Sequence, residues 1–92
     1  MNIDDRIRKL LNFIDLSTED LARKTDTKYG RWTTIRKTGG RARAEEVEIL
    51  CKLYPQFQMW IATGETLPEA GQVSPELEQI VENYEETGMD TQ

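Results

Sequence analysis

The sequence lacks histidine altogether, and it contains a single cysteine, three prolines and no long run of apolar residues. Histidine is the commonest general base and the commonest metal ligand in proteins, so its absence argues against most hydrolytic and metal chemistry. The lone Cys51 cannot form an intramolecular disulfide or a CxxC zinc site, and we interpret it as a small core residue. We therefore expect a protein that is not an enzyme and that uses no cofactor and no metal.

Membrane association is not expected either. No apolar segment approaches the roughly 18 residues that a membrane span requires. Met1 is followed by Asp4 and Asp5, which is unlike the basic and apolar start of a secretory signal peptide. The 92 residues, of which 37% are hydrophobic and 32% are charged, suit a small globular protein, and we expect it in the cytoplasm.

The net charge of −5 conceals an uneven distribution of charge along the chain. Residues 1–22 have a net charge of −2, residues 23–52 carry nine basic and four acidic residues, and residues 53–92 contain eight acidic residues and no lysine or arginine. A basic stretch on an otherwise acidic chain is typical of a surface that binds phosphate groups. An ordinary solvated helix face would have the same composition, so charge alone leaves both interpretations open.

Apolar residues recur at helical spacing, and no segment of useful length alternates as a β-strand would. The apolar stripe of the first helix, which follows Asn2 as N-cap, comprises Ile3, Ile7, Leu10, Leu11 and Ile14. A second helix begins at Ser17, which forms a capping box with Asp20, and ends near Lys24. The remaining helices are expected at residues 28–37, 44–53, 55–64 and 74–88. The sequence thus predicts an all-α fold, with a compact five-helix domain over residues 1–64 and a loop and C-terminal helix over residues 65–92.

The second and third predicted helices are joined by a short turn at residues 25–27, as a helix-turn-helix requires. Leu21 and Ala22 supply the apolar and small residues where the helices cross, while Trp32 and Ile35 face the same core from the third helix. The outer face of the third helix is left with side chains suited to base edges and phosphates, namely Lys28, Tyr29, Arg31, Thr33 and Thr34. Packing of Tyr29 on the domain surface is an alternative.

The stretch LSTEDLARKTDTKYGRWTTIRK, residues 16–37, resembles the Cro/lambda-repressor type of helix-turn-helix regulator. The resemblance covers about residues 3–63, and YPQFQMWIATGETLPEAGQVSPE is similar to the endings of small phage-type and proteobacterial regulators. Asp26 stands where the family usually has glycine, Thr27 where it has a small aliphatic residue, and Trp32 where it has valine or isoleucine. Aspartate tolerates the left-handed backbone conformation better than most residues, so we expect the turn to be retained.

The resemblance implies a role for each candidate residue on double-stranded operator DNA. The residues that would face the major groove are Lys28, Tyr29, Thr33 and Thr34, with Arg31 at the flank. Ser17 and Thr18, at the start of the second helix, would bind a phosphate. The pair Gly39 and Gly40 would let the backbone approach the duplex, and the phosphate-binding residues around this pair would be Arg36, Lys37, Arg41 and Arg43.

A single small domain contacts few base pairs, so specific binding usually requires two copies on neighbouring half-sites. The candidate dimer interface is the apolar stripe of the sixth helix, comprising Leu77, Ile80, Val81 and Tyr84. The same helix could fold back on its own domain, but we favour a homodimer because residues 53–92 hold more apolar residues than a five-helix core needs. The acidic residues of this segment would keep it away from DNA.

The function predicted from the sequence is that of a dimeric repressor that acts by occupying a promoter. Because there is no separate ligand domain, control would come from concentration or from a regulatory protein partner. Two alternatives retain the fold. An antitoxin-like protein would co-purify with a second protein, and a protein-interaction module would lack salt-dependent DNA binding.

Overall fold

The structure, a computed structural model, describes residues 1–80 of the chain. Its α-helices are α1 (Ile3–Phe13), α2 (Thr18–Thr25), α3 (Tyr29–Lys37), α4 (Ala44–Leu53) and α5 (Gln58–Thr63), with single 3-10 turns η1 (Pro55–Phe57) and η2 (Pro68–Ala70). A further helical segment covers residues 75–80. Within residues 1–80 the only extended pairing is an isolated bridge between Leu67 and Gln72, so the predicted all-α class is confirmed.

Side-chain caps explain where the first helices begin. Asn2 accepts a hydrogen bond from the backbone N–H of Asp5, and the Asp5 carboxylate accepts one from the N–H of Asn2. The hydroxyl of Ser17 likewise accepts the N–H of Asp20 at the start of α2. By contrast α3 begins after Lys28, which makes no side-chain cap, so its stability depends on tertiary packing.

One continuous core holds the helices together. Its buried apolar members are Ile7, Leu10, Leu11, Leu21, Ala22, Trp32, Ile35, Leu50, Phe57, Trp60 and Ile61. These include Leu21, Ala22, Trp32 and Ile35, the core residues expected on the second and third helices, which confirms the periodicity argument there. The predicted stripe of the first helix differs from the structure at its ends. Ile3 is 36% exposed at the first turn, and Ile14 is the C-cap beyond the last turn, although it is half-buried and still packs against the core.

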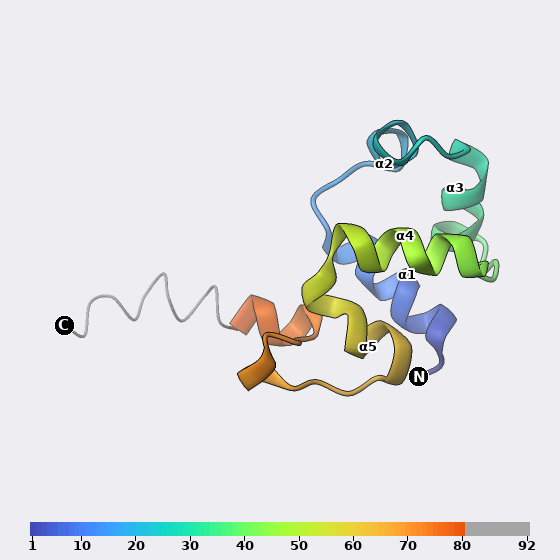
Figure 1. Cartoon of the computed structure of the whole chain (residues 1–92). Helices are drawn as coiled ribbons and strands as arrows, with labels where there is room; N and C mark the ends of the chain where they lie inside the picture. The colour runs from blue at the N-terminus through green and yellow to red at the C-terminus, as the bar shows by residue number, and fades with distance from the viewer. Residues whose placement is uncertain (81–92) are drawn as a thin grey trace.

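The turn between α2 and α3 has the conformation expected from its sequence. Asp26 adopts the left-handed conformation, with φ 55° and ψ 48°. Its N–H donates to the carbonyls of Ala22 and Arg23, and the N–H of Thr27 donates to Ala22 as well, which closes the last turn of α2. Figure 1 shows α2 viewed along its axis and α3 beside it, seen from the side, so the turn changes the direction of the chain sharply.

The predicted helix boundaries differ from the observed ones mainly at two places. The fourth helix has the expected bounds. The third begins at Tyr29, because Lys28 has an extended backbone and serves as N-cap. The fifth is split, since the turn after Pro55 is a 3-10 turn and α5 starts only at Gln58. It ends as expected at Gly64, whose φ of 81° favours glycine.

The segment after α5 is bonded back to the domain. The Gln72 side chain accepts the N–H of Met59 at 2.8 Å and donates to the carbonyl of Pro55 at 2.9 Å. Pro75 is fully buried, and Glu76 pairs with Lys9 of α1. The start of the sixth helix therefore packs on its own domain. In Figure 1 residues 65–80 lie at the opposite end of the molecule from α2 and α3.

Candidate nucleic-acid interface

The outer face of α3 carries exposed polar and basic side chains while its inner face is buried. Lys28 and Tyr29 are exposed, Tyr29 to 54%, whereas Trp32 and Ile35 are almost completely inaccessible. Thr33 lies one turn after Tyr29 and is half-buried. Its hydroxyl donates to the Tyr29 carbonyl at 3.2 Å, so its methyl group and lone pairs remain available to a ligand.

An open hollow of about 640 Å³ lies between the first turn of α2 and the outer face of α3. The residues that line it are Ser17, Thr18, Glu19, Tyr29, Arg36 and Lys37. The first N–H groups of a helix lack intrahelical acceptors, and the positive end of the helix dipole attracts anions. The Lys37 ammonium adds positive charge, while the Glu19 carboxylate opposes it. The hollow can hold one phosphate group that approaches from the α3 side.

Arg36 is tied into the domain, in contrast to the phosphate role predicted for it. Its guanidinium donates to the hydroxyl of Thr18 at 2.6 Å and to the carbonyls of Leu11 and Leu16. These bonds join α3 to the end of α1 and to the segment leading into α2. Arg36 Nε is buried without a hydrogen-bond partner in the described chain. The side chain thus fixes the position of α3, and three of its acceptors would have to be given up for it to reach DNA.

Arg31 is likewise occupied. Its Nε and Nη2 donate to the two carboxylate oxygens of Glu46 at 2.8 and 2.9 Å, and Nη2 also donates to the carbonyl of Arg41 at 3.0 Å. The Glu46 side chain is only 8% exposed. The hydrogen bond from Arg31 holds the pKa of this carboxyl below its ordinary value. Arg31 therefore anchors the flank of α3 to the start of α4, a different setting from a side chain free to pair with guanine.

The remaining cations lie on the surface next to α3. Lys37, Arg41 and Arg43 are exposed, and the Arg41 side chain is 90% accessible despite a 3.4 Å contact with Asp4. Arg43 is the N-cap residue of α4. These three side chains have the freedom that phosphate contacts require.

The glycine pair has a structural role that the sequence argument missed. A Cβ on Gly40 would lie 2.3 Å from Cγ2 of Thr34, and the Gly40 N–H donates to the Thr34 carbonyl. Gly40 is therefore required because the chain folds back onto α3. Close approach to a duplex is not needed to explain it.

The predicted dimerisation residues are only partly within the described chain. Leu77 is half-buried and Ile80 is 61% exposed, while Val81 and Tyr84 lie outside the described residues. Ile80 borders a shallow apolar hollow of about 340 Å³, which also includes Lys9, Phe13 and Pro75. An apolar surface thus continues from α1 onto the segment 75–80.

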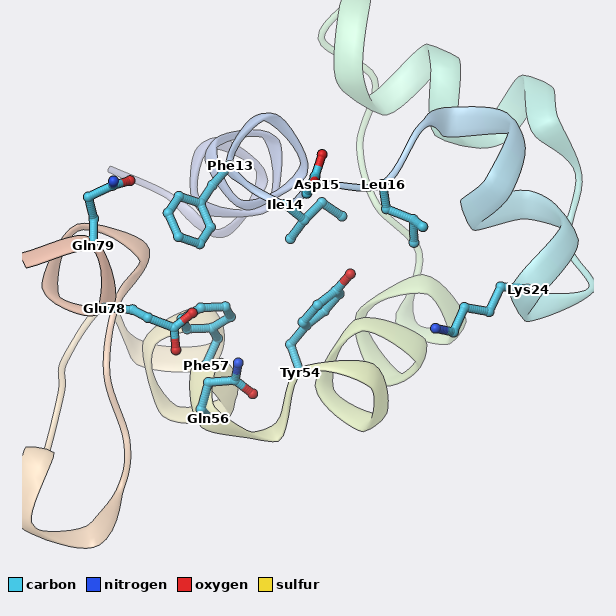
Figure 2. Close-up of a pocket in the computed structure, with 10 residues that line it drawn as sticks. All are labelled: Phe13, Ile14, Asp15, Leu16, Lys24, Tyr54, Gln56, Phe57, Glu78 and Gln79. Atoms are coloured by element: carbon cyan, nitrogen blue, oxygen red, sulfur yellow. The ribbon is translucent and has the colours of Figure 1, made fainter. Parts of the chain in front are cut away.

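A third hollow, of about 490 Å³, lies where the end of α1 faces the α4–η1 junction. Figure 2 shows Phe13, Tyr54 and Phe57 around it, with Lys24 at one side and Glu78 at the other. The Phe13 and Phe57 rings meet edge to face with centroids 6.1 Å apart, and burial raises the pKa of the Tyr54 hydroxyl. These aromatic rings continue the core, and no cluster suited to metal binding occurs within residues 1–80.

Two further features concern the reactivity and environment of the chain. Cys51 is half-buried against the core, and burial raises the pKa of its thiol, so it is not set up as a nucleophile. Among the described helices none has the length and apolar character of a membrane span.

Fold and surface together define a small all-α protein in which two turn-linked helices present basic and polar side chains at one end. No protein-family model and no curated protein matches the sequence. Among solved structures, the chain is similar to Pf6r from the filamentous phage Pf6 of Pseudomonas aeruginosa PA01, with 36% sequence identity and a TM-score of 0.73. The match covers 83% of this chain and 97% of Pf6r. The chain belongs to the same family as this phage protein.

Proposed function

We propose that this protein is a sequence-specific double-stranded-DNA-binding regulator of the phage repressor type. In this proposal α2 and α3 form a helix-turn-helix, and α3 enters the major groove. The observation that carries the proposal is the two-sided character of α3. Trp32 and Ile35 anchor one side in the core, while Tyr29 and Thr33 lie on the other side, after the exposed Lys28 and next to the hollow at the start of α2. Membership of a phage protein family supports a phage-type regulator.

The contacts proposed for DNA follow from which side chains lie on the outer surface at α3. Among them, Thr34 also packs its methyl group against Gly40. Lys28, Tyr29, Thr33 and Thr34 are assigned to base edges, and Arg31 supports the flank of α3 through Glu46.

Phosphates are assigned to the first turn of α2 and to the cations that have no strong internal partner. The phosphate-binding residues are Ser17, Thr18, Lys37, Arg41 and Arg43. Arg36 is left out of this set because its guanidinium holds α3 against the end of α1.

The test is selection of bound duplexes from a random pool, followed by titration of the selected duplex at several salt concentrations. The expected result is an enriched sequence with two related half-sites, and an affinity that falls steeply as salt rises. Lys37→Ala should weaken binding to every sequence and reduce the salt slope by about 1. Lys52→Ala is the matched control, since it also removes one exposed positive charge but from the far end of α4.

Two outcomes would contradict the proposal. One is no complex with the full-length protein at low ionic strength. The other is an equal effect of Lys37→Ala and Lys52→Ala, which would show attraction to the overall charge and not to the α3 surface.

A further inference from the structure

Gly30 lies on the outer face of α3, in the first turn of the helix and next to Tyr29. It is exposed, and a Cβ built on it would meet no atom within 4 Å. Glycine inside a helix is unfavourable relative to alanine because the unfolded chain loses more conformational freedom on folding. Gly30 therefore lowers the stability of α3, and no contact in the described chain requires glycine there.

The other glycines of the described chain differ from Gly30 in this respect. Three have a positive φ that disfavours a side chain, namely Gly39, Gly64 and Gly71. Gly40 is packed against Thr34, where a Cβ would clash. Gly30 alone among the glycines within residues 1–80 has helical backbone and open space. No contact within residues 1–80 therefore requires glycine at position 30, which leaves room for a partner outside the domain.

The neighbours of Gly30 on α3 indicate what kind of partner this surface would meet. Residues three and four positions later share its side of the helix, and these are Thr33 and Thr34. Both threonine hydroxyls donate to backbone carbonyls of α3, Thr34 to Gly30 itself at 2.8 Å. Both threonine side chains are short and bonded to the helix backbone, whereas the neighbouring Tyr29 has a large ring that is 54% exposed.

We propose that Gly30 is a positioning residue that lets the backbone of α3 approach the base edges closely, so that the short threonine side chains can reach them. This inference rests on the proposed function, since it requires α3 to enter the major groove. A side chain at residue 30 would hold the helix away by roughly the length of a carbon–carbon bond, about 1.5 Å. The two threonines would lose contact first, because they have the shortest reach.

The experiment compares Gly30→Ala and Gly30→Leu in the full chain, with Asn12→Ala as control. Asn12 is an exposed residue of α1, where alanine also improves helix propensity. Both Gly30 variants should be at least as stable as the wild type, with melting temperatures higher by roughly 2–5 °C. The affinity of Gly30→Ala for the selected duplex should fall about tenfold or more, and that of Gly30→Leu further still.

The loss should be greater on the selected duplex than on a random one, because phosphate contacts alone govern nonspecific binding. Asn12→Ala should bind as the wild type does. The inference is overturned if Gly30→Ala is more stable and binds the selected duplex unchanged, or if it unfolds at lower temperature. If the wild type itself binds no DNA, the proposed function has failed. The melting temperature of Gly30→Ala then still shows whether the glycine has a structural role.

Discussion

The indole Nε1–H of Trp32 donates a hydrogen bond to the hydroxyl of Thr27 at 2.6 Å, and this bond links α3 to the turn that precedes it. Trp32 is buried to 1% exposure, so its N–H would otherwise lack a partner. Thr27 also bonds the hydroxyl of Thr25, which donates to the carbonyl of Leu21. Two of the three residues that depart from the Cro/lambda-type pattern, Thr27 and Trp32, are thus joined by a hydrogen bond.

Replacing Thr27 should reveal this dependence. Thr27→Val keeps the shape but removes the hydroxyl, and it should lower the free energy of unfolding by about 1–3 kcal/mol because a buried donor is left without a partner. Thr27→Ser retains the hydroxyl and should lose less. Chemical denaturation of the three proteins measures the difference. Equal stability of the valine variant and the wild type would mean that the indole finds another acceptor.

The ion pair of Arg31 and Glu46 predicts a dependence of stability on acidity. The pKa of Glu46 is lowered in the folded state, so the pair stabilises the protein fully above the unfolded value of about 4.5. The contribution is lost as the pH falls from there through the folded pKa. Glu46→Gln should lower stability at pH 7 by about 1–3 kcal/mol and flatten this part of the pH profile.

Glu45→Gln provides the comparison for that profile. Glu45 is the neighbouring exposed acid of α4, and removing its charge should leave stability almost unchanged at pH 7. Urea denaturation between pH 3 and pH 7 would follow both variants. A profile of Glu46→Gln that is as steep as the wild-type profile would assign the acid sensitivity to other carboxylates.

Arg36 and Lys37 are adjacent cations, but we expect Arg36 to affect the stability of the fold and Lys37 to affect DNA affinity. Arg36→Ala should destabilise the fold by about 1–3 kcal/mol because its bonds to Thr18 and to two carbonyls are lost. Arg36→Lys should not rescue it, since an ammonium cannot reproduce the planar fork of the guanidinium. Lys37→Ala should leave the melting temperature unchanged and weaken DNA binding. Thermal unfolding and DNA titration of the same samples separate the two roles. Loss of DNA affinity with full stability in Arg36→Ala would restore the phosphate contact predicted from the sequence.

Trp32 and Arg36 show which features of the fold the sequence can predict and which it cannot. Periodicity places Trp32 and Ile35 on one face and predicts their burial, because burial of a helix stripe depends on local spacing. Caps at Asn2 and Ser17 and the left-handed Asp26 are equally local and were predictable. The partners of Arg36 are carbonyls 20 and 25 residues earlier, which only the packing of α3 against α1 brings within reach.

The burial of two charged residues, Arg6 and Glu46, was not predicted from the sequence. Arg6 donates to the carbonyl of Ile61 at 3.0 Å and to that of Met1 at 2.7 Å, so it fastens the end of α5 to α1. Its position one turn before Leu10 in the apolar stripe was an available signal. Glu46 likewise lies one turn before the buried Leu50, but its burial also depends on Arg31 from another helix, which the sequence does not show. Counting the basic residues of a sequence stretch therefore overestimates the number of cations that are free to bind phosphate.

The last prediction concerns the apolar surface around Ile80. We expect two copies of the chain to associate through this end, which is remote from α3 in Figure 1. Ile80→Asp should convert a dimer into a monomer without lowering the melting temperature, because Ile80 is 61% exposed and contributes little to its own domain. Asn12→Asp introduces the same charge at an exposed position of α1 that does not line this hollow, and it should leave the dimer intact. Sedimentation equilibrium measures the mass of each variant. A wild-type monomer at micromolar concentration would mean that a single copy binds the operator. Equal dissociation of both variants would place the dimer contact elsewhere.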